Sequence, residues 1–77
     1  MSSNTFDHAR TLLAANVKSA RLAAGISQEE LAFRAGIDRT YASQIERAIA
    51  NPSLGITCSV ADALGCTVTD LLTVQGR

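Results

Sequence analysis

Apolar residues recur every three or four positions along most of this chain. In the first long segment they fall at Phe6, Ala9, Leu13, Val17, Ala20 and Ala24. This spacing places them on one face of an α-helix. Few consecutive residues favour β-strands, and no two-residue hairpin turn signal separates the apolar stretches. The pattern therefore predicts an all-α protein whose first helix covers residues 6–24.

Glycines and a single proline divide the rest of the chain into shorter helices. Gly25, Gly36 and Gly65 each follow a periodic apolar stretch and can end a helix in the left-handed conformation. Pro52 cannot continue a helix, so a loop is expected over residues 48–53. Four further helices are therefore predicted, over residues 28–35, 39–47, 54–64 and 68–73.

Capping residues mark where these helices begin. Ser27 precedes Glu30 by three positions, and Thr67 precedes Asp70 by the same spacing. Each pair has the pattern of a capping box, in which two side chains bond to each other's backbone N–H groups. Asp38 is expected to cap the third helix and to complement its dipole.

Residues 28–47 have the layout of a helix-turn-helix. Two short helices joined by a turn of about three residues cannot pack antiparallel, so they cross steeply. Ala32 is small where the two helices approach, and Gly36 permits the positive φ that the turn needs. The apolar positions expected to hold this unit against the first helix are Leu31, Ala35, Ile37, Ala42 and Ile45.

If Ala42 and Ile45 face inward, a continuous polar strip faces outward on the third helix. The strip consists of Arg39, Thr40, Ser43, Gln44 and Arg47. Arginine can bond guanine, glutamine can bond adenine, and threonine can contact the thymine methyl group. The alternative is an ordinary solvated helix face. The strip lacks the Glu and Lys that usually fill such a face, and it lies on the second helix of the unit, so base contact is favoured.

Other side chains of this unit are better placed for DNA phosphates. They are Ser43, Arg47 and the neighbouring Tyr41. Gln28 begins the second helix, where free N–H groups and the helix dipole favour a phosphate. The Gln28 side chain could instead brace the third helix, and the sequence leaves both roles open.

With 77 residues, the chain has room for one domain. That domain is expected over residues 6–73, between a disordered tail at residues 1–5 and a frayed end at residues 74–77. A core of this size usually supplies about 3–5 kcal/mol of net stability. Self-association is therefore expected as a further source of stability.

The net charge is zero, with seven Lys and Arg against seven Asp and Glu. Many nucleic-acid-binding domains are strongly basic, so the total charge alone argues against that function. The placement of the cations matters more than their number, because cations on one face act together on a polyanion.

No metal site, cofactor site or catalytic centre is indicated. Cys58 and Cys66 lie among apolar residues and, with His8, lack the spacing of a closed zinc site. No Ser/His/Asp set, glycine-rich phosphate loop or close carboxylate pair is present, so an enzyme is not expected. The N-terminus is not a signal peptide, and no stretch approaches the roughly 18 apolar residues of a membrane span. A cytoplasmic protein without membrane contact is expected.

Residues 21–72 resemble the phage-repressor-like (Cro/XRE) helix-turn-helix family. The matching stretches are A-G-I-S-Q-E-E-L-A-F-R-A-G-I at 24–37, Q-I-E-R at 44–47, N-P-S-L at 51–54 and A-L-G at 63–65. The stretch D-R-T-Y-A-S-Q-I-E-R at 38–47 also resembles the controller proteins of restriction–modification systems, which are dimeric domains that both activate and repress. The resemblance implies a compact five-helix, lambda-repressor-like DNA-binding domain.

The resemblance also implies roles for individual residues. The implied base contacts are Arg39, Thr40 and Gln44. The implied DNA-backbone contacts are Gln28, Tyr41, Ser43 and Arg47. Arg21 and Glu46 match an ion pair that ties the first helix to the third in this family.

The dimer interface of the family lies on the C-terminal helices. The apolar residues there that exceed what a small core can bury are Ile56, Val60, Val68, Leu72 and Val74. Some of them are expected to face a second copy of the chain; the alternative is a wholly intramolecular core. The chain departs from the family pattern at Gly55, Thr57 and Cys58, which affects the expected packing of the fourth helix.

The leading interpretation is a transcriptional regulator that binds a near-palindromic double-stranded DNA operator as a homodimer. RNA polymerase is a candidate further partner. The alternative is an antitoxin-like interaction module whose apolar surface binds a partner protein. Co-purification of an equimolar partner would favour this alternative.

Overall fold

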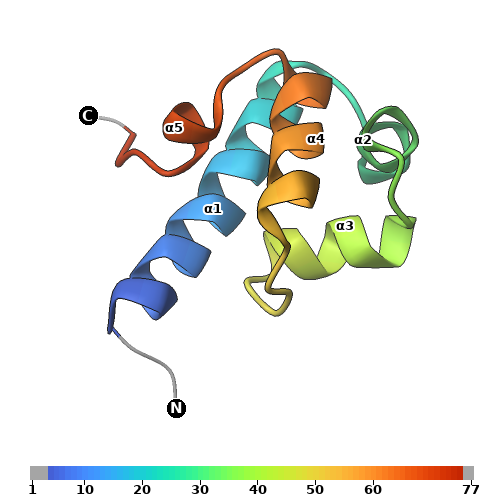
Figure 1. Cartoon of the computed structure of the whole chain (residues 1–77). Helices are drawn as coiled ribbons and strands as arrows, with labels where there is room; N and C mark the ends of the chain where they lie inside the picture. The colour runs from blue at the N-terminus through green and yellow to red at the C-terminus, as the bar shows by residue number, and fades with distance from the viewer. Residues whose placement is uncertain (1–3, 76–77) are drawn as a thin grey trace.

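Five helices make up the part of the chain that the computed structural model describes, residues 4–75, and no strand occurs in that part. The helices are α1 (Asn4–Ala23), α2 (Gln28–Ala35), α3 (Arg39–Glu46), α4 (Leu54–Leu64) and α5 (Val68–Leu71). In Figure 1, α2 and α3 lie on one flank of α4, and α1 and α5 lie on the other. The predicted all-α fold with a helix-turn-helix at α2 and α3 is confirmed.

Four predicted boundaries, in three helices, differ from the observed ones. The first helix begins at Asn4, so Asn4 and Thr5 are helical and not part of a tail. Its first turn contains Asp7, whose charge complements the helix dipole. At the other end α1 stops at Ala23, one residue early. Residues 1–3 and 76–77, the rest of the predicted tail and frayed end, lie outside the described residues.

The third and fifth helices are shorter than predicted. The third ends at Glu46, with Arg47 as its C-cap. The fifth ends at Leu71, two residues before the predicted end. There the buried Asn16 amide of α1 donates to the carbonyl oxygens of Leu71 (2.9 Å) and Thr73 (2.8 Å). These tertiary hydrogen bonds satisfy carbonyl groups at the helix end, so the chain can leave the helix there.

One of the two predicted capping boxes is complete. Thr67 Oγ1 accepts from the Asp70 N–H, and the Asp70 carboxylate accepts from the Thr67 N–H, each at 3.0 Å. At α2 only half of the motif forms. Ser27 Oγ accepts from the Glu30 N–H at 3.0 Å, but the Glu30 carboxylate turns to Arg34 at 2.8 Å. The predicted box at α2 is therefore wrong in its second half, because an i,i+4 ion pair on the exposed face takes the carboxylate.

The core lies where α1, α2, α3 and α4 meet, and α5 closes one side of it. Its buried apolar cluster consists of Leu13, Val17, Leu31, Ile45, Ala50, Val60, Ala61 and Leu71. Ala42 is also buried, and Ala35 and Ile37 pack against the cluster while partly exposed. The predicted inward face of α3 is therefore the observed one, and this fixes which face of α3 points outward.

No helix within residues 4–75 is long and apolar enough to cross a membrane.

Candidate nucleic-acid interface

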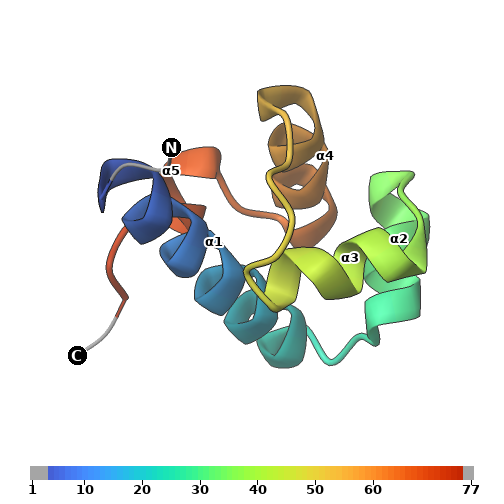
Figure 2. The same cartoon turned by 90° about the horizontal axis from the view of Figure 1, so that it is seen from below.

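The third helix is held at the surface with its polar side outward. Asp38 caps it, accepting a hydrogen bond from the Thr40 N–H at 2.9 Å. Ala42 is 1% exposed and Ile45 is 3% exposed, so both anchor the helix to the core. Figure 2, seen from below, shows α3 and the loop after it on the near side of the molecule. The opposite face of α3 is thus free to meet a ligand.

The structure places the predicted base-contacting residues on this outward face to different degrees. Arg39 and Thr40 are exposed at the start of α3, and Gln44 is half-buried one turn further on. A helix that presents its N-terminal residues in this way has the geometry by which helix-turn-helix proteins enter the major groove.

The residues expected to contact the DNA backbone are less uniformly exposed. Arg47 is exposed at the end of α3, and Ser43 is half-buried. Tyr41 is also half-buried, and its ring packs against the apolar cluster. Packing limits Tyr41 to presenting one edge, such as its hydroxyl, to a phosphate.

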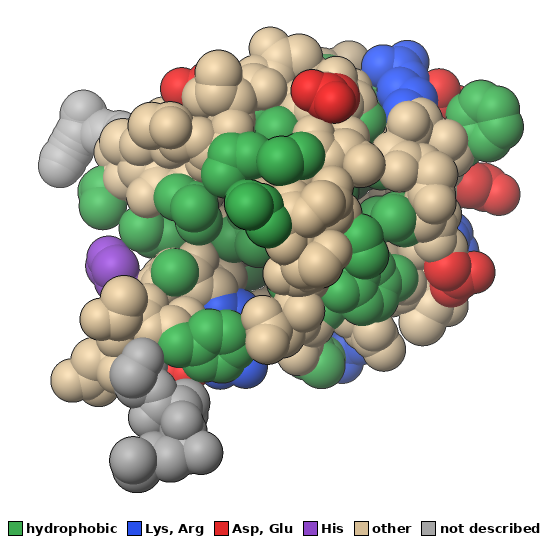
Figure 3. Space-filling model, in the orientation of Figure 1, with side chains coloured by type: hydrophobic (Ala, Val, Ile, Leu, Met, Phe, Trp, Pro, Cys, Tyr) green, Lys and Arg blue, Asp and Glu red, His purple; other side chains and the backbone are tan. Residues whose placement is uncertain are grey.

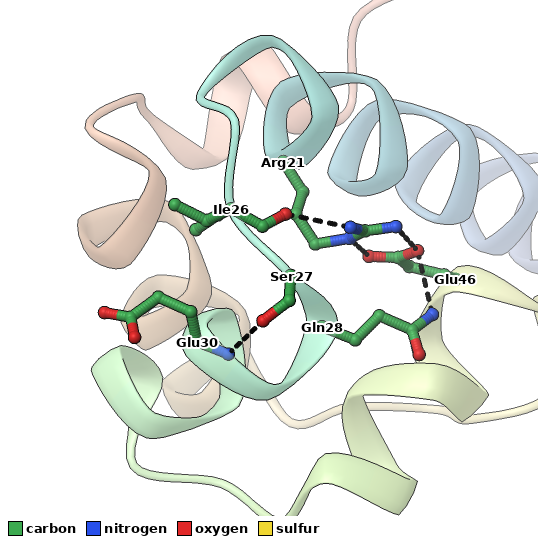
Figure 4. A network of polar contacts seen from close by, with 6 residues as sticks. All are labelled: Arg21, Ile26, Ser27, Gln28, Glu30 and Glu46. Atoms are coloured by element: carbon green, nitrogen blue, oxygen red, sulfur yellow. Dashed lines mark hydrogen bonds and ion pairs between the residues drawn. The ribbon is translucent and has the colours of Figure 1, made fainter.

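A nearly buried ion pair joins α1 to α3 behind this face (Figure 4). Arg21 Nε lies 2.6 Å from Glu46 Oε2, and Arg21 Nη2 donates to Glu46 Oε1 at 3.0 Å. The Glu46 side chain is only 2% exposed, and Arg21 Nη1 also donates to the Ile26 carbonyl oxygen at 2.9 Å. The hydrogen bonds and charge of Glu46 raise the pKa of Arg21, against the opposing effect of its burial. The structure thus brings together the two residues predicted to pair.

Gln28 joins the same network. Its Nε2 donates to Glu46 Oε1 at 3.1 Å, so Gln28 braces α3 (Figure 4). This brace is one of the two roles that the sequence left open for Gln28. A carboxylate only accepts hydrogen bonds, so the NH₂ group of the amide must face Glu46. One N–H of that group remains for a phosphate. The brace and the predicted phosphate contact are therefore compatible.

The loop between α3 and α4 extends the same face, which the sequence reasoning did not anticipate. Figure 1 shows the loop beside the end of α3. Figure 2, seen from below, shows the loop and α3 together on the near side of the molecule. The N–H groups of Ile49 and Ala50 both donate to the Gln44 carbonyl oxygen, at 2.9 and 3.1 Å, and Asn51 is exposed. The available signal was a polar residue, Asn51, just before Pro52 and four positions after Arg47, the last residue of the polar strip.

The predicted dimer residues separate into three groups. Val60 is 1% exposed and lies in the core of the single chain, so its assignment to the interface is wrong. It shares the inner face of α4 with Thr57 and Ala61, which are also buried. Ile56 and Val68 are half-buried against the core, whereas Leu72 is 42% and Val74 is 71% exposed.

The cysteines are free thiols in the described chain. Cys58 is exposed and Cys66 is half-buried. Burial, with a smaller contribution from Asp70, raises the pKa of Cys66 and so favours its neutral thiol. Within residues 4–75, no group of three or more His, Cys, Asp or Glu side chains is placed to hold a metal ion.

These features define a DNA-binding helix-turn-helix domain. The family model for helix-turn-helix domains matches residues 17–71, and the chain belongs to this family, of Cro/XRE type. Proteins of this family are transcriptional regulators rather than enzymes.

The similar proteins include restriction–modification controllers. The chain is 42% identical over 67 residues to control protein C.SmaI from Serratia marcescens, a match that covers 87% of this chain and 80% of that protein. The solved structure of controller protein C.AhdI from Aeromonas hydrophila is 35% identical with a TM-score of 0.78, and covers 80% of this chain and 94% of its own. A hypothetical transcription factor from Neisseria is 43% identical with a TM-score of 0.81, over 84% of this chain and 73% of its own.

Proposed function

We propose that this regulator binds a near-palindromic operator as a homodimer and controls transcription as a restriction–modification controller protein does. One observation carries the proposal: Ala42 and Ile45 are buried, so the opposite side of α3, with Arg39 and Thr40, is exposed to DNA. The similarity to two named controller proteins supports the narrower role.

Each proposed base contact follows from side-chain chemistry. Arg39 can donate two hydrogen bonds to guanine O6 and N7, and Gln44 can bond adenine N6 and N7. Thr40 can place its methyl group against that of thymine. Gln28, Tyr41, Ser43 and Arg47 are proposed to bind phosphates, which fix the orientation of the domain on the duplex.

A homodimer would double this interface. In two-fold symmetric regulators the two recognition helices enter the major groove about 34 Å apart, one turn of DNA. The exposed apolar residues Leu72 and Val74 lie beyond α5, away from the polar strip of α3. A dimer through that side leaves both α3 helices free for DNA.

The direct test is selection of bound duplexes from a random DNA pool. We expect one enriched sequence with two inverted half-sites whose centres are about one helical turn apart. Enrichment of a single unrepeated site would overturn the homodimer, and no enrichment would overturn sequence-specific binding.

Replacement of Arg39 by alanine should relax specificity at one base pair of each half-site. The expected loss is about 1–3 kcal/mol of discrimination at that pair, because a bidentate arginine–guanine contact is removed. Titration of the selected operator and its single-base variants measures this loss. Arg34→Ala, which removes an exposed arginine of α2 paired with Glu30, is the control and should leave the base preference unchanged. Identical preference profiles for Arg39→Ala and wild type would refute the assignment.

A protein partner is the second candidate function. Phe33 on α2 is 82% exposed, so its aromatic ring is accessible to a partner protein. Such a surface suits RNA polymerase bound beside the operator, or the toxin of an antitoxin-like module. Purification from the native cell discriminates them: an equimolar small protein supports the antitoxin, and recovery of polymerase only with operator DNA supports the regulator.

A further inference from the structure

An apolar hollow opens between the first half of α1, the start of α4, and α5. It is lined mainly by Phe6, Ala9, Leu13, Pro52, Val68 and Leu72, and has a volume of about 270 Å³. Figure 3 shows apolar side chains gathered on this side of the molecule. The view of Figure 3 is turned by 90° from that of Figure 2, in which α3 is on the near side. The hollow therefore opens on a different side from α3, although Asn51, in the loop that extends the proposed DNA-binding face, lines one edge of it.

A projecting side chain stands beside the hollow. Leu54, at the first position of α4, lines the hollow and is 73% exposed. Leu72 forms another part of the rim and is 42% exposed. A two-fold interface uses the same patch on both subunits, so that patch must complement itself. A projecting Leu54 side chain next to the hollow meets this requirement, because the side chain of each copy can enter the hollow of the other.

Arg10 lines the hollow, and Asp7, one helical turn earlier on α1, carries the opposite charge. Asp7 Oδ1 and Arg10 Nη2 are 3.4 Å apart, a long contact between side chains that are 48% and 32% exposed. The Arg10 guanidinium lies 5.1 Å from the centre of the Phe6 ring. Arg10 Nε is buried, and no acceptor within residues 4–75 reaches it. A buried N–H group without an acceptor is costly, so an acceptor from another molecule would be stabilising.

These features identify a second copy of the chain as the occupant. The hollow is smaller than the roughly 300–1,000 Å³ typical of small-molecule sites, and it is open on one side. One apolar side chain fits it better, and this chain carries a suitable one at its rim. Opposite charges one helical turn apart on α1 would face their counterparts across a two-fold axis.

We propose that the dimer interface includes this hollow, with Leu54 of each protomer entering the hollow of the other. Asp7 of one protomer then lies beside the partner's Arg10, and the reverse pair forms by symmetry. The inference rests on the proposed homodimer and extends its interface from α4 and α5 to the first half of α1.

The first test compares two leucine-to-arginine variants by sedimentation equilibrium. Leu54→Arg should raise the dimer Kd about tenfold or more, as expected when a central apolar contact is lost. Leu22→Arg is the matched control, because Leu22 is 59% exposed at the other end of α1 and lies outside the hollow. Equal dimer Kd values for the two variants would overturn the proposal. Circular dichroism melting checks that both variants fold.

The second test uses charge reversal and does not depend on Leu54. Asp7→Arg leaves two positive charges, and Arg10→Asp two negative charges, at positions 7 and 10 of each protomer. In either homodimer the proposed pairs across the interface then have the same sign, so each variant alone should dimerise more weakly than wild type. An equimolar mixture should form heterodimers with a Kd close to that of wild type, because every pair across the interface is then of opposite sign. Both variants keep like charges within their own chain, so recovery on mixing reports contacts between chains. A mixture no tighter than the separate variants would overturn the cross-pairing.

DNA binding separates failure of this interface from failure of the proposed function. On a single half-site, Leu54→Arg should bind as wild type does, whereas on the full operator it should lose the advantage of two joined subunits. Equal loss on both duplexes would place Leu54 in the DNA contact and overturn the interface. If wild type dimerises but binds no selected DNA, the proposed function fails while the dimer tests still decide the interface.

Discussion

Glu46 is an unusual residue to find behind a DNA-binding helix, because its charge would repel phosphates if it were exposed. Its side chain is only 2% exposed, and the bidentate contact with Arg21 neutralises it. The same carboxylate accepts from Gln28, so one acidic residue fixes α3 to both α1 and the start of α2. Its role is to hold the helix that carries the polar strip.

Glu46→Gln should destabilise the domain strongly. Removing one charge of a buried pair costs about 3–5 kcal/mol, because the remaining charge stays buried without compensation. A domain of this size has about that much net stability, so the variant should be largely unfolded at room temperature. Urea or thermal unfolding measures the change.

The matched control is Glu30→Gln. It breaks the exposed Glu30–Arg34 pair, whose side chains are 45% and 46% exposed. A surface pair contributes at most about 1 kcal/mol, so the control should melt near wild type. Similar midpoints for both variants would show that the Arg21–Glu46 pair does not hold the fold together.

At the scale of the element, α3 is stabilised mainly by its cap and by its contacts with the rest of the domain. It has eight residues, too few for a stable isolated helix in water. The Asp38 cap satisfies its first turn, and the burial of Ala42 and Ile45 supplies most of its stability. The orientation of the polar strip is therefore as well defined as the packing of these two side chains.

The short helix α5 depends on the side chains at its ends in the same way. It has four residues, enclosed by the Thr67–Asp70 capping box and by Asn16 of α1. Its position matters for the proposed dimer because Val68 and Leu72 line the hollow proposed as part of the interface.

The capping box predicts a pH dependence. Hydrogen bonds from the backbone and hydroxyl of Thr67 lower the pKa of Asp70 below its usual 3.8. The folded state therefore holds this proton less tightly than the unfolded state does. The resulting stability is present above about pH 4 and is lost as the pH falls through the lowered pKa. In Asp70→Asn, the urea midpoint should fall less than in wild type between about pH 5 and pH 2.5.

Asp62→Asn provides the control for this experiment, because Asp62 is exposed on α4 and only its backbone carbonyl, not its carboxylate, takes part in a helix cap. Its pH profile should run parallel to that of wild type. If the profile of Asp70→Asn is parallel as well, the cap does not couple folding to protonation.

At the scale of the whole molecule, the zero net charge is compatible with DNA binding. Several cations are already paired with acidic neighbours: Arg10 with Asp7, Arg21 with Glu46, and Arg34 with Glu30. Arg39 and Arg47, at the two ends of α3, are exposed. Lys18 is also exposed, on α1. The exposed cations on α3 itself are thus few.

DNA binding should therefore depend only modestly on salt. Each phosphate neutralised contributes about −0.9 to the slope of log K against log salt concentration. With one or two arginines per protomer on phosphates, the dimer should give a slope of about −2 to −4. Fluorescence anisotropy titrations over about 50–300 mM salt measure it.

Arg47→Ala should make the slope shallower by about 2 for the dimer, with little change in base preference. A wild-type slope of about −8 or steeper would show that more cations reach the backbone than α3 carries.

The sequence by itself determined the helix order, the turn chemistry and the inward face of α3, because these depend on local spacing and capping. It misplaced the ends of α1, α3 and α5 by one or two residues. At α5 the boundary is set by Asn16, which is 54 to 57 positions away in the chain from the carbonyl groups it binds. It also gave no sign that Ala48, without the freedom of glycine, would adopt a positive φ of 59° after α3.

Only the tertiary structure decided which apolar residues are core and which are surface. Val60 and Leu72 are both apolar residues of the C-terminal helices, but packing between helices buries Val60 and leaves Leu72 partly exposed. The joining of Gln28 to the Arg21–Glu46 pair and the hollow beside Leu54 likewise arise where distant segments meet. Local sequence patterns determine which helices form; contacts between helices determine which side chains remain available for DNA and for a second subunit.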